Sequence, residues 1–258
     1  MEETAGKYFK HPEVVYLKQR LNLDHIALQD SFDRLEKVLD EELPKLGPDS
    51  IPQVNFQELA ESNGKFNDEV VAKLKKSGVI IIRNVVSKDQ AELWNQGLID
   101  YFQLNGIDPN DKYTNMFESY WSKSQLEARH HPNMILVQKA LMKLWSTNPG
   151  LDDQVDLTKP LTYNDRLRMR KPDQKSTLAA HMDSGTLSRW ADPISSKETF
   201  KSIFQGKWEE YDPFCVNGRG VTLLDEHCSF FRYYVHTVSN HHFLSENSIT
   251  FFRNPILN

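Results

Sequence analysis

His181 and Asp183 are the residues of this sequence whose types and spacing point most directly to chemistry. On an extended strand, residues two positions apart lie on the same face, so this imidazole and this carboxylate can reach one metal ion. Two histidines and one carboxylate occupy one face of a six-coordinate Fe(II) and leave the opposite positions for an organic co-substrate and O₂. The pair therefore supplies two of three ligands, and a second histidine is needed. The alternative interpretation is an ordinary surface pair or turn.

The neighbouring sequence favours a strand for this pair. Residues 177–180 are small and apolar, and Ser184-Gly185 is a turn signal directly after the pair. Further upstream, the cationic residues of 166–170 alternate with apolar ones, which on a strand places Arg166, Arg168 and Arg170 on one face. Residues 171–174 are typical of a turn. The pattern predicts strand, turn and strand, with His181 on the second strand.

Composition limits the classes of protein to consider. The 258 residues carry a formal net charge of -5 and no basic stripe, so nucleic acid is not expected as a main partner. No apolar run approaches the roughly 20 residues that cross a bilayer, so a membrane is not expected either. Cys215 and Cys228 lack disulfide or zinc spacing, and the acidic first residues lack a secretory signal. We expect a cytoplasmic protein, with a nuclear location as the alternative, and a small molecule rather than nucleic acid or a membrane as its partner.

The rest of the chain consists of helical patterns in front of a β-rich part that begins near Leu161. Apolar residues such as Leu28, Phe32, Leu35 and Leu39 recur at helical spacing and predict one long helix or two shorter ones. A β-branched run after Gly78 predicts a buried strand, and Ser87 is suited to cap the helix that follows. The expected helices cover 12–46, 68–76, 88–102, 121–129 and Pro132 to about 145, and the expected extended segments cover 51–56 and 79–86.

Four stretches of the sequence carry a family resemblance: YWSKSQLEAR at 120–129, DRLRMR at 165–170, HMDSGTLSRW at 181–190 and GKWEEYDPF at 206–214. Together they resemble the family called domain of unknown function 1479, and the order of elements is similar to that of Fe(II)/2-oxoglutarate-dependent oxygenases. The resemblance covers roughly positions 70 to 219. It implies an α+β fold in which N-terminal helices pack on a double-stranded β-helix, or jelly-roll, core. It also implies Fe(II) and 2-oxoglutarate as cofactors, with His181 and Asp183 as metal ligands.

The resemblance ends near Arg219. We therefore expect an N-terminal helical extension at 1–70, the N-terminal part of an oxygenase-like jelly roll at 71–219, and a divergent tail at 220–258, with the jelly-roll core incomplete at its C-terminus. The tail contains four histidines. His236 lies in the strand-like run at 233–238 and is the best candidate for the third ligand, with a surface histidine as the alternative. The other three tail histidines are His227, His241 and His242.

In this oxygenase class the distal carboxylate of 2-oxoglutarate needs a cation, and a guanidinium suits it through its bidentate fork. Arg168, central in the alternating strand, is our candidate for that cofactor contact. The alternative is that Arg168 and its neighbours are solvated charges. Two rival functions also stay open, namely a catalytically inactive jelly-roll relative that acts as a binding module, and a cupin-like metalloprotein without 2-oxoglutarate turnover.

Overall fold

The computed structural model of the chain describes residues 12–108, 119–144, 146–147, 156, 158–160, 200–212, 214–216, 232–236 and 248–252. Its N-terminal part forms two helices, α2 (Pro12–Leu21) and α3 (His25–Glu42), followed by the short 3-10 helices η1 (Leu43–Lys45) and η2 (Pro48–Ser50). The break between the helices lies at Asn22, which has a φ of 45°. Asp24 then starts α3 by accepting hydrogen bonds from the amides of Ile26 and Ala27.

The next elements are short strands and helices, most of which lie where the sequence predicts them. They are β1 (Gln53–Asn55), α4 (Phe56–Glu61), α5 (Asp68–Ser77), β2 (Val79–Arg83), α6 (Lys88–Leu104), α7 (Lys123–His130) and α8 (Pro132–Met142). Ser87 caps α6 as expected, because its side chain accepts from the Gln90 amide. The helix α4 is not expected from the sequence, α6 ends at Leu104 rather than at 102, and α7 starts at Lys123 rather than at 121. Two further ends differ as well. The strand ends at Arg83 rather than at 86 because Asn84 has a φ of 59°, and α8 ends before 145.

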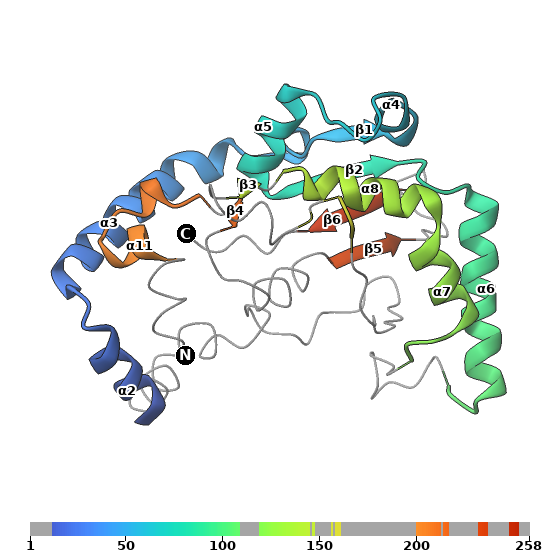
Figure 1. Ribbon diagram of the computed structural model, residues 1–258, viewed down its shortest axis with the longest axis horizontal. Helices are drawn as coiled ribbons and strands as arrows, with labels where there is room; N and C mark the ends of the chain where they lie inside the picture. The colour runs from blue at the N-terminus through green and yellow to red at the C-terminus, as the bar shows by residue number, and fades with distance from the viewer. Residues whose placement is uncertain are drawn as a thin grey trace.

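The main sheet joins segments that lie far apart in the chain (Figure 1). Its strand order is β1-β2-β6-β5, with β5 at Arg232–His236 and β6 at Ser248–Phe252. The β1–β2 pair is parallel, whereas β6 runs antiparallel to both β2 and β5. Strands from all three expected segments of the chain share this sheet. The division into those segments, and the jelly-roll core, stay predictions because residues 161–199 lie outside the described residues.

A second, two-stranded sheet pairs β3 (Ser146–Thr147) with β4 (Cys215–Val216) in parallel. In the sequence that connects β3 to β4, the structure also describes the helix α11 (Lys201–Phe204) and the 3-10 helix η3 (Trp208–Glu210). Residues just before 148 and just after 214 are therefore hydrogen-bonded neighbours. The candidate residues Arg168, His181 and Asp183 all fall in the sequence that separates β3 from β4.

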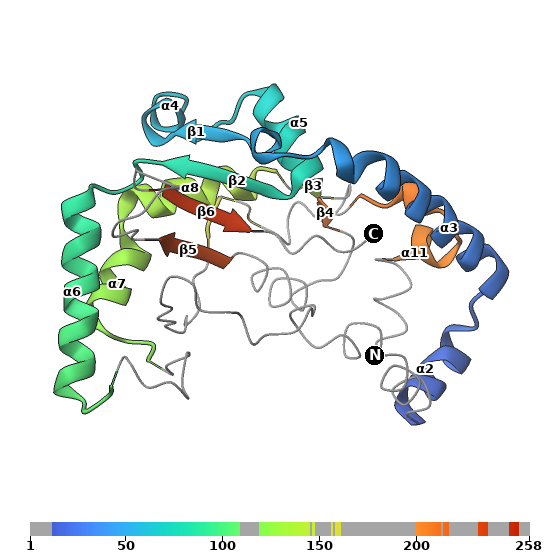
Figure 2. The ribbon, with the colours of Figure 1, turned by 180° about the vertical axis from the view of Figure 1, so that it is seen from behind.

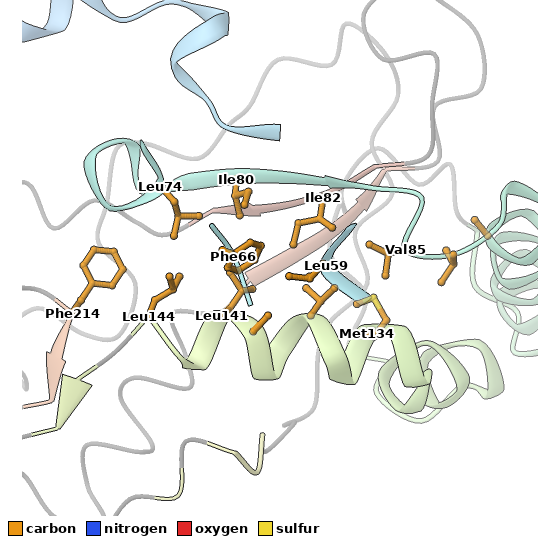
Figure 3. Packing of buried hydrophobic residues seen from close by; sticks show 14 of the residues in the cluster. Leu59, Phe66, Leu74, Ile80, Ile82, Val85, Met134, Leu141, Leu144 and Phe214 are labelled. Atoms are coloured by element: carbon orange, nitrogen blue, oxygen red, sulfur yellow. The ribbon is translucent and has the colours of Figure 1, made fainter. Parts of the chain in front are cut away.

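The hydrophobic core lies between β2 and α8 (Figure 3). Ile80 and Ile82 are fully buried, and they point toward α8, where Met134 and Val137 are also buried. Alternation along a strand places these two isoleucines on one face, which explains why the apolar run of β2 packs against a helix. Other buried members of the core come from neighbouring elements: Leu59, Phe66, Leu74, Val85, Leu141, Leu144 and Phe214.

The helix α11 lies beside α3 at the end of the molecule away from α6 and α7, as both views show (Figures 1 and 2). Arg34 of α3 donates from Nε to Glu209 Oε1 at 2.7 Å and from Nη2 to Gly206 O at 2.8 Å. Gly206 is buried against Ala27. The predicted apolar stripe of α3 is only partly confirmed at this junction, because Leu35 is buried whereas Phe32 is 52% exposed.

Candidate functional site

The structure describes the position of one of the four residues expected at the site. His236 is the last residue of β5, at the edge of the described sheet. The other three, Arg168, His181 and Asp183, lie outside the described residues. Their assignment as cofactor and metal contacts therefore stays a prediction, as does the role of His236 as third ligand.

The register of the sheet places His236 in a polar row. Across the four strands, Asn55 pairs with Arg83, Arg83 with Ser248, and Ser248 with His236. We call these four residues the polar row. The adjacent row consists of apolar residues and includes Ile82, which packs toward α8. Because successive residues of a strand point to opposite faces, Asn55 and Arg83 lie on the face of the sheet that α8 does not cover.

Two side chains of the polar row are described in detail, and both are half-buried. The Asn55 side chain caps α4 by accepting from the Gln57 amide at 3.0 Å. Arg83 donates from Nε to Oε1 of Gln53 at 2.9 Å. Gln53 pairs with Ile81, two positions before Arg83 on the same face, so this is a diagonal contact between neighbouring strands. The contact fixes the direction of the Arg83 guanidinium.

Sequence reasoning did not single out Arg83, although a signal exists. Arg83 ends a run of four β-branched apolar residues, so it is a charged residue at the end of a buried strand. A guanidinium offers five N–H donors in a planar fork that matches a carboxylate. The polar row therefore brings together a cation that recognises carboxylates and an imidazole-bearing position, on strands that are far apart in sequence.

A second feature that sequence reasoning missed is a buried polar cluster at the start of α7. Ser122 caps the helix and forms a reciprocal capping box with Gln125, whose Nε2 donates to Ser119 O at 2.6 Å. Arg129 is 3% exposed, donates from Nη2 to Tyr120 O at 2.6 Å, and lies 5.4 Å from the Trp121 ring. The Ser-x-x-Gln spacing was the available signal. These contacts hold the segment before α7 against the helix, which is a structural role.

The chemistry of the expected donor set suits iron, because imidazole and carboxylate are ligands that Fe(II) accepts in a facial arrangement. Within the part of the chain that the structure describes, no three His, Cys, Asp or Glu residues gather closely enough to share a metal ion. Also among the described residues, no helix combines the length and apolar character needed to span a membrane.

Comparison with known proteins shows the relationships of the chain. It is 30% identical over 190 residues to the uncharacterized protein YbiU of Escherichia coli (strain K12), an alignment that covers 66% of this chain and 44% of that protein. The crystal structure of GlcNAc Inducible Gene 2, GIG2 (DUF1479), from Candida albicans matches with a TM-score of 0.67 and 33% identity, over 77% of this chain and 44% of that one.

A third relative is the crystal structure of the putative oxidoreductase from Salmonella typhimurium LT2, with a TM-score of 0.65 and 29% identity over 80% of this chain and 54% of that one. The chain thus spans about half the length of these relatives. A family model described as Gig2-like matches residues 11–247, which include every residue expected at the site. This chain belongs to the Gig2-like family.

Proposed function

We propose that this protein is an oxidoreductase, and specifically an Fe(II)/2-oxoglutarate-dependent dioxygenase that oxidises a small molecule. The observation that carries the proposal is the likeness, at 29% identity and a TM-score of 0.65, to a protein described as a putative oxidoreductase. The His-x-Asp pair at 181 and 183 supports the more specific part, because it provides two ligands of a facial iron site. A jelly-roll core and a cytoplasmic location belong to the same proposal.

Each candidate residue has one role in this proposal. His181 and Asp183 bind Fe(II) from one strand, and His236 completes the facial set from β5. Arg168 binds the distal carboxylate of 2-oxoglutarate through two parallel N–H···O bonds. Such a centre would supply the oxidation of a substrate C–H bond by O₂, with one oxygen atom entering the substrate as a hydroxyl and the other entering succinate as 2-oxoglutarate loses CO₂. The polypeptide contributes the geometry of binding and the exclusion of water.

Metal binding by the full chain is the first test. The purified protein is titrated with Co(II) alone, and the expected result is one bound ion whose affinity falls at least about 100-fold in His181→Ala and in Asp183→Ala. His236→Ala is expected to reduce the affinity by a similar factor, because it also removes one of the three ligands. His130→Ala is the matched control, since His130 is an exposed histidine on α7 that bonds the Leu126 carbonyl at 2.8 Å. Equal Co(II) affinity in wild type and His181→Ala would refute the assignment of the ligands.

Turnover is the second test. Wild-type protein with Fe(II), ascorbate and 2-oxoglutarate is expected to form succinate slowly without added substrate, and His181→Ala is expected to form none above background. Arg168→Gln is expected to raise the 2-oxoglutarate concentration needed for half-maximal turnover. Metal binding without succinate in any condition would favour the cupin-like alternative, and absence of both would favour a binding module without catalysis.

A further inference from the structure

Arg83 differs from the other arginines whose side chains are described. Arg34 forms a two-point ion pair with Glu209, at 2.7 Å and 3.2 Å, and Arg129 donates to the Tyr120 carbonyl and lies beside the Trp121 ring. Arg83 has a single contact, from Nε to the neutral amide oxygen of Gln53. Among the described residues no carboxylate pairs with it. Its two terminal nitrogens, which form the fork that binds carboxylates, are left for another partner.

Arg83 is half-buried, whereas its contact with Gln53 is exposed. Ile81, which shares its face of the sheet, is 8% exposed. Charged side chains that are partly removed from water are usually paired, because desolvation of the charge costs free energy. The neighbours of Arg83 on β1, Gln53 and Asn55, are uncharged and are already engaged with Arg83 and with the Gln57 amide. Arg83 therefore has no described carboxylate to balance its charge.

The backbone around Arg83 is well fixed. The β1–β2 ladder holds it from one side through Asn55, and the β2–β6 ladder holds it from the other side through Ser248. Asn84, the next residue, is in the left-handed region with a φ of 59°, a conformation that ends the strand directly after Arg83. Asn133 of α8 donates from Nδ2 to the Val85 carbonyl at 2.7 Å and fixes the chain beyond the bend. A fixed guanidinium loses little conformational entropy when it binds an anion.

The register also sets the distance between Arg83 and the candidate metal ligand. Arg83 and His236 occupy the same row, two strand spacings apart, which is about 10 Å along the row. The Nε contact with Gln53 directs the Arg83 side chain toward β1, so an acid held by this guanidinium lies on the β1 side of the polar row.

We infer that Arg83 and Gln53 form a binding position for the carboxylate of the substrate, so that the substrate is a small organic acid. This inference rests on the proposed function for the reaction, whereas the binding position itself stands on the geometry of β1 and β2. Arg83 binds the carboxylate through its two terminal nitrogens, and Gln53 orients the guanidinium through Nε. The position is distinct from Arg168, which is assigned to the distal carboxylate of 2-oxoglutarate.

The test measures acid binding by the full chain without metal, so that it does not depend on turnover. Ligand-observed NMR compares benzoate with benzamide, and glutarate with glutaramide, as probes that differ in charge but not in size. Wild-type protein is expected to bind each acid more tightly than its amide. Arg83→Gln is expected to weaken acid binding about tenfold or more, because a charge-assisted pair is lost, and to leave amide binding unchanged. Arg83→Lys keeps the charge without the fork and is expected to be intermediate.

Two further variants sharpen the result. Gln53→Leu leaves the charge but removes the Nε contact, and a loss of about threefold in acid binding is expected. Arg34→Gln is the matched control, because it makes the same chemical change at an exposed arginine at the other end of the fold and is expected to leave acid binding unchanged. Acids that bind wild type and Arg83→Gln equally, or no better than the amides, would overturn the inference.

A final arm separates the substrate from the co-substrate. Binding of 2-oxoglutarate is measured with Co(II) present in Arg83→Gln and in Arg168→Gln. The inference requires that Arg168→Gln weakens 2-oxoglutarate binding and that Arg83→Gln does not. The opposite pattern would mean that Arg83 holds the co-substrate, and it would refute the assignment to the substrate. If no metal binds at all, the proposed function fails, whereas the acid titrations still decide whether the carboxylate position exists.

Discussion

The contact between Gly206 and α3 allows a prediction whose magnitude can be worked from the structure. Gly206 has a φ of 72°, and a Cβ built on it lies 2.5 Å from the backbone oxygen of Ala27 and 3.2 Å from the Ala27 Cβ. The left-handed conformation costs an alanine about 1–2 kcal/mol. The contact with a backbone atom cannot be relieved by a side-chain rotation, so overpacking adds about 1–3 kcal/mol. Gly206→Ala is expected to destabilise the fold by about 2–5 kcal/mol.

Gly106 provides the matched control for this variant. It also has a positive φ, 65°, but a Cβ there meets nothing within 4 Å. Gly106→Ala therefore carries the conformational cost alone, and it is expected to destabilise by about 1–2 kcal/mol. The difference in the free energy of unfolding between the two variants measures the contact of residue 206, which lies between α11 and η3, with α3. Arg34 donates to the Gly206 carbonyl at 2.8 Å, so a shift of the backbone at residue 206 that lengthens this bond adds to the same difference.

The assay is urea unfolding followed by tryptophan fluorescence and by far-UV circular dichroism. The free energies of unfolding of wild type, Gly106→Ala and Gly206→Ala are compared, with the same dependence of that free energy on urea concentration used for all three proteins. Gly206→Ala is expected to have the lowest midpoint, by a margin over Gly106→Ala of about 1–3 kcal/mol. Equal losses in the two variants would refute the reasoning, because they would mean that Gly206 does not touch Ala27 in solution.

Three other predictions follow from described contacts. Ile82→Ala removes a fully buried side chain between β2 and α8 and is expected to cost about 2–5 kcal/mol in urea unfolding, whereas Ile26→Ala, at a site 77% exposed, is expected to cost less than about 0.5 kcal/mol. Asp24→Ala removes the cap of α3 and is expected to cost about 1 kcal/mol, with a loss of helical circular dichroism if the helix frays. Lys45 and Lys76, each 2.7 Å from the Glu42 carboxylate, lower its pKa from 4.5 to about 2, so its stabilising effect is present above pH 4.5 and is lost as the pH falls toward 2. The Tm difference between wild type and Glu42→Gln is therefore expected to shrink over that range, and a difference that stays constant from pH 6 to pH 3 would contradict the ion pairs.

Local sequence determined most of the helical framework. Ser87 at the start of α6 was identifiable because an N-cap depends on residues within one turn of it. The apolar run of β2 was identifiable because its β-branched residues favour a strand in most contexts. The His-x-Asp pair is likewise a local signal, because two residues on the same strand share a face when they are two positions apart. Such spacing says nothing about residues on other strands. This is why the sequence predicts two metal ligands with a physical reason and cannot place the third.

Tertiary structure decided everything that joins distant segments. Arg34 and Glu209 are 175 positions apart, and neither residue carries a local signal for the other. The exposure of Phe32 depends on which part of α3 meets α11 rather than on helical spacing. The polar row likewise exists only because β6 inserts between β2 and β5 in one particular register. A shift of one residue would move His236 out of the row of Arg83, because the side-chain period of a strand is two.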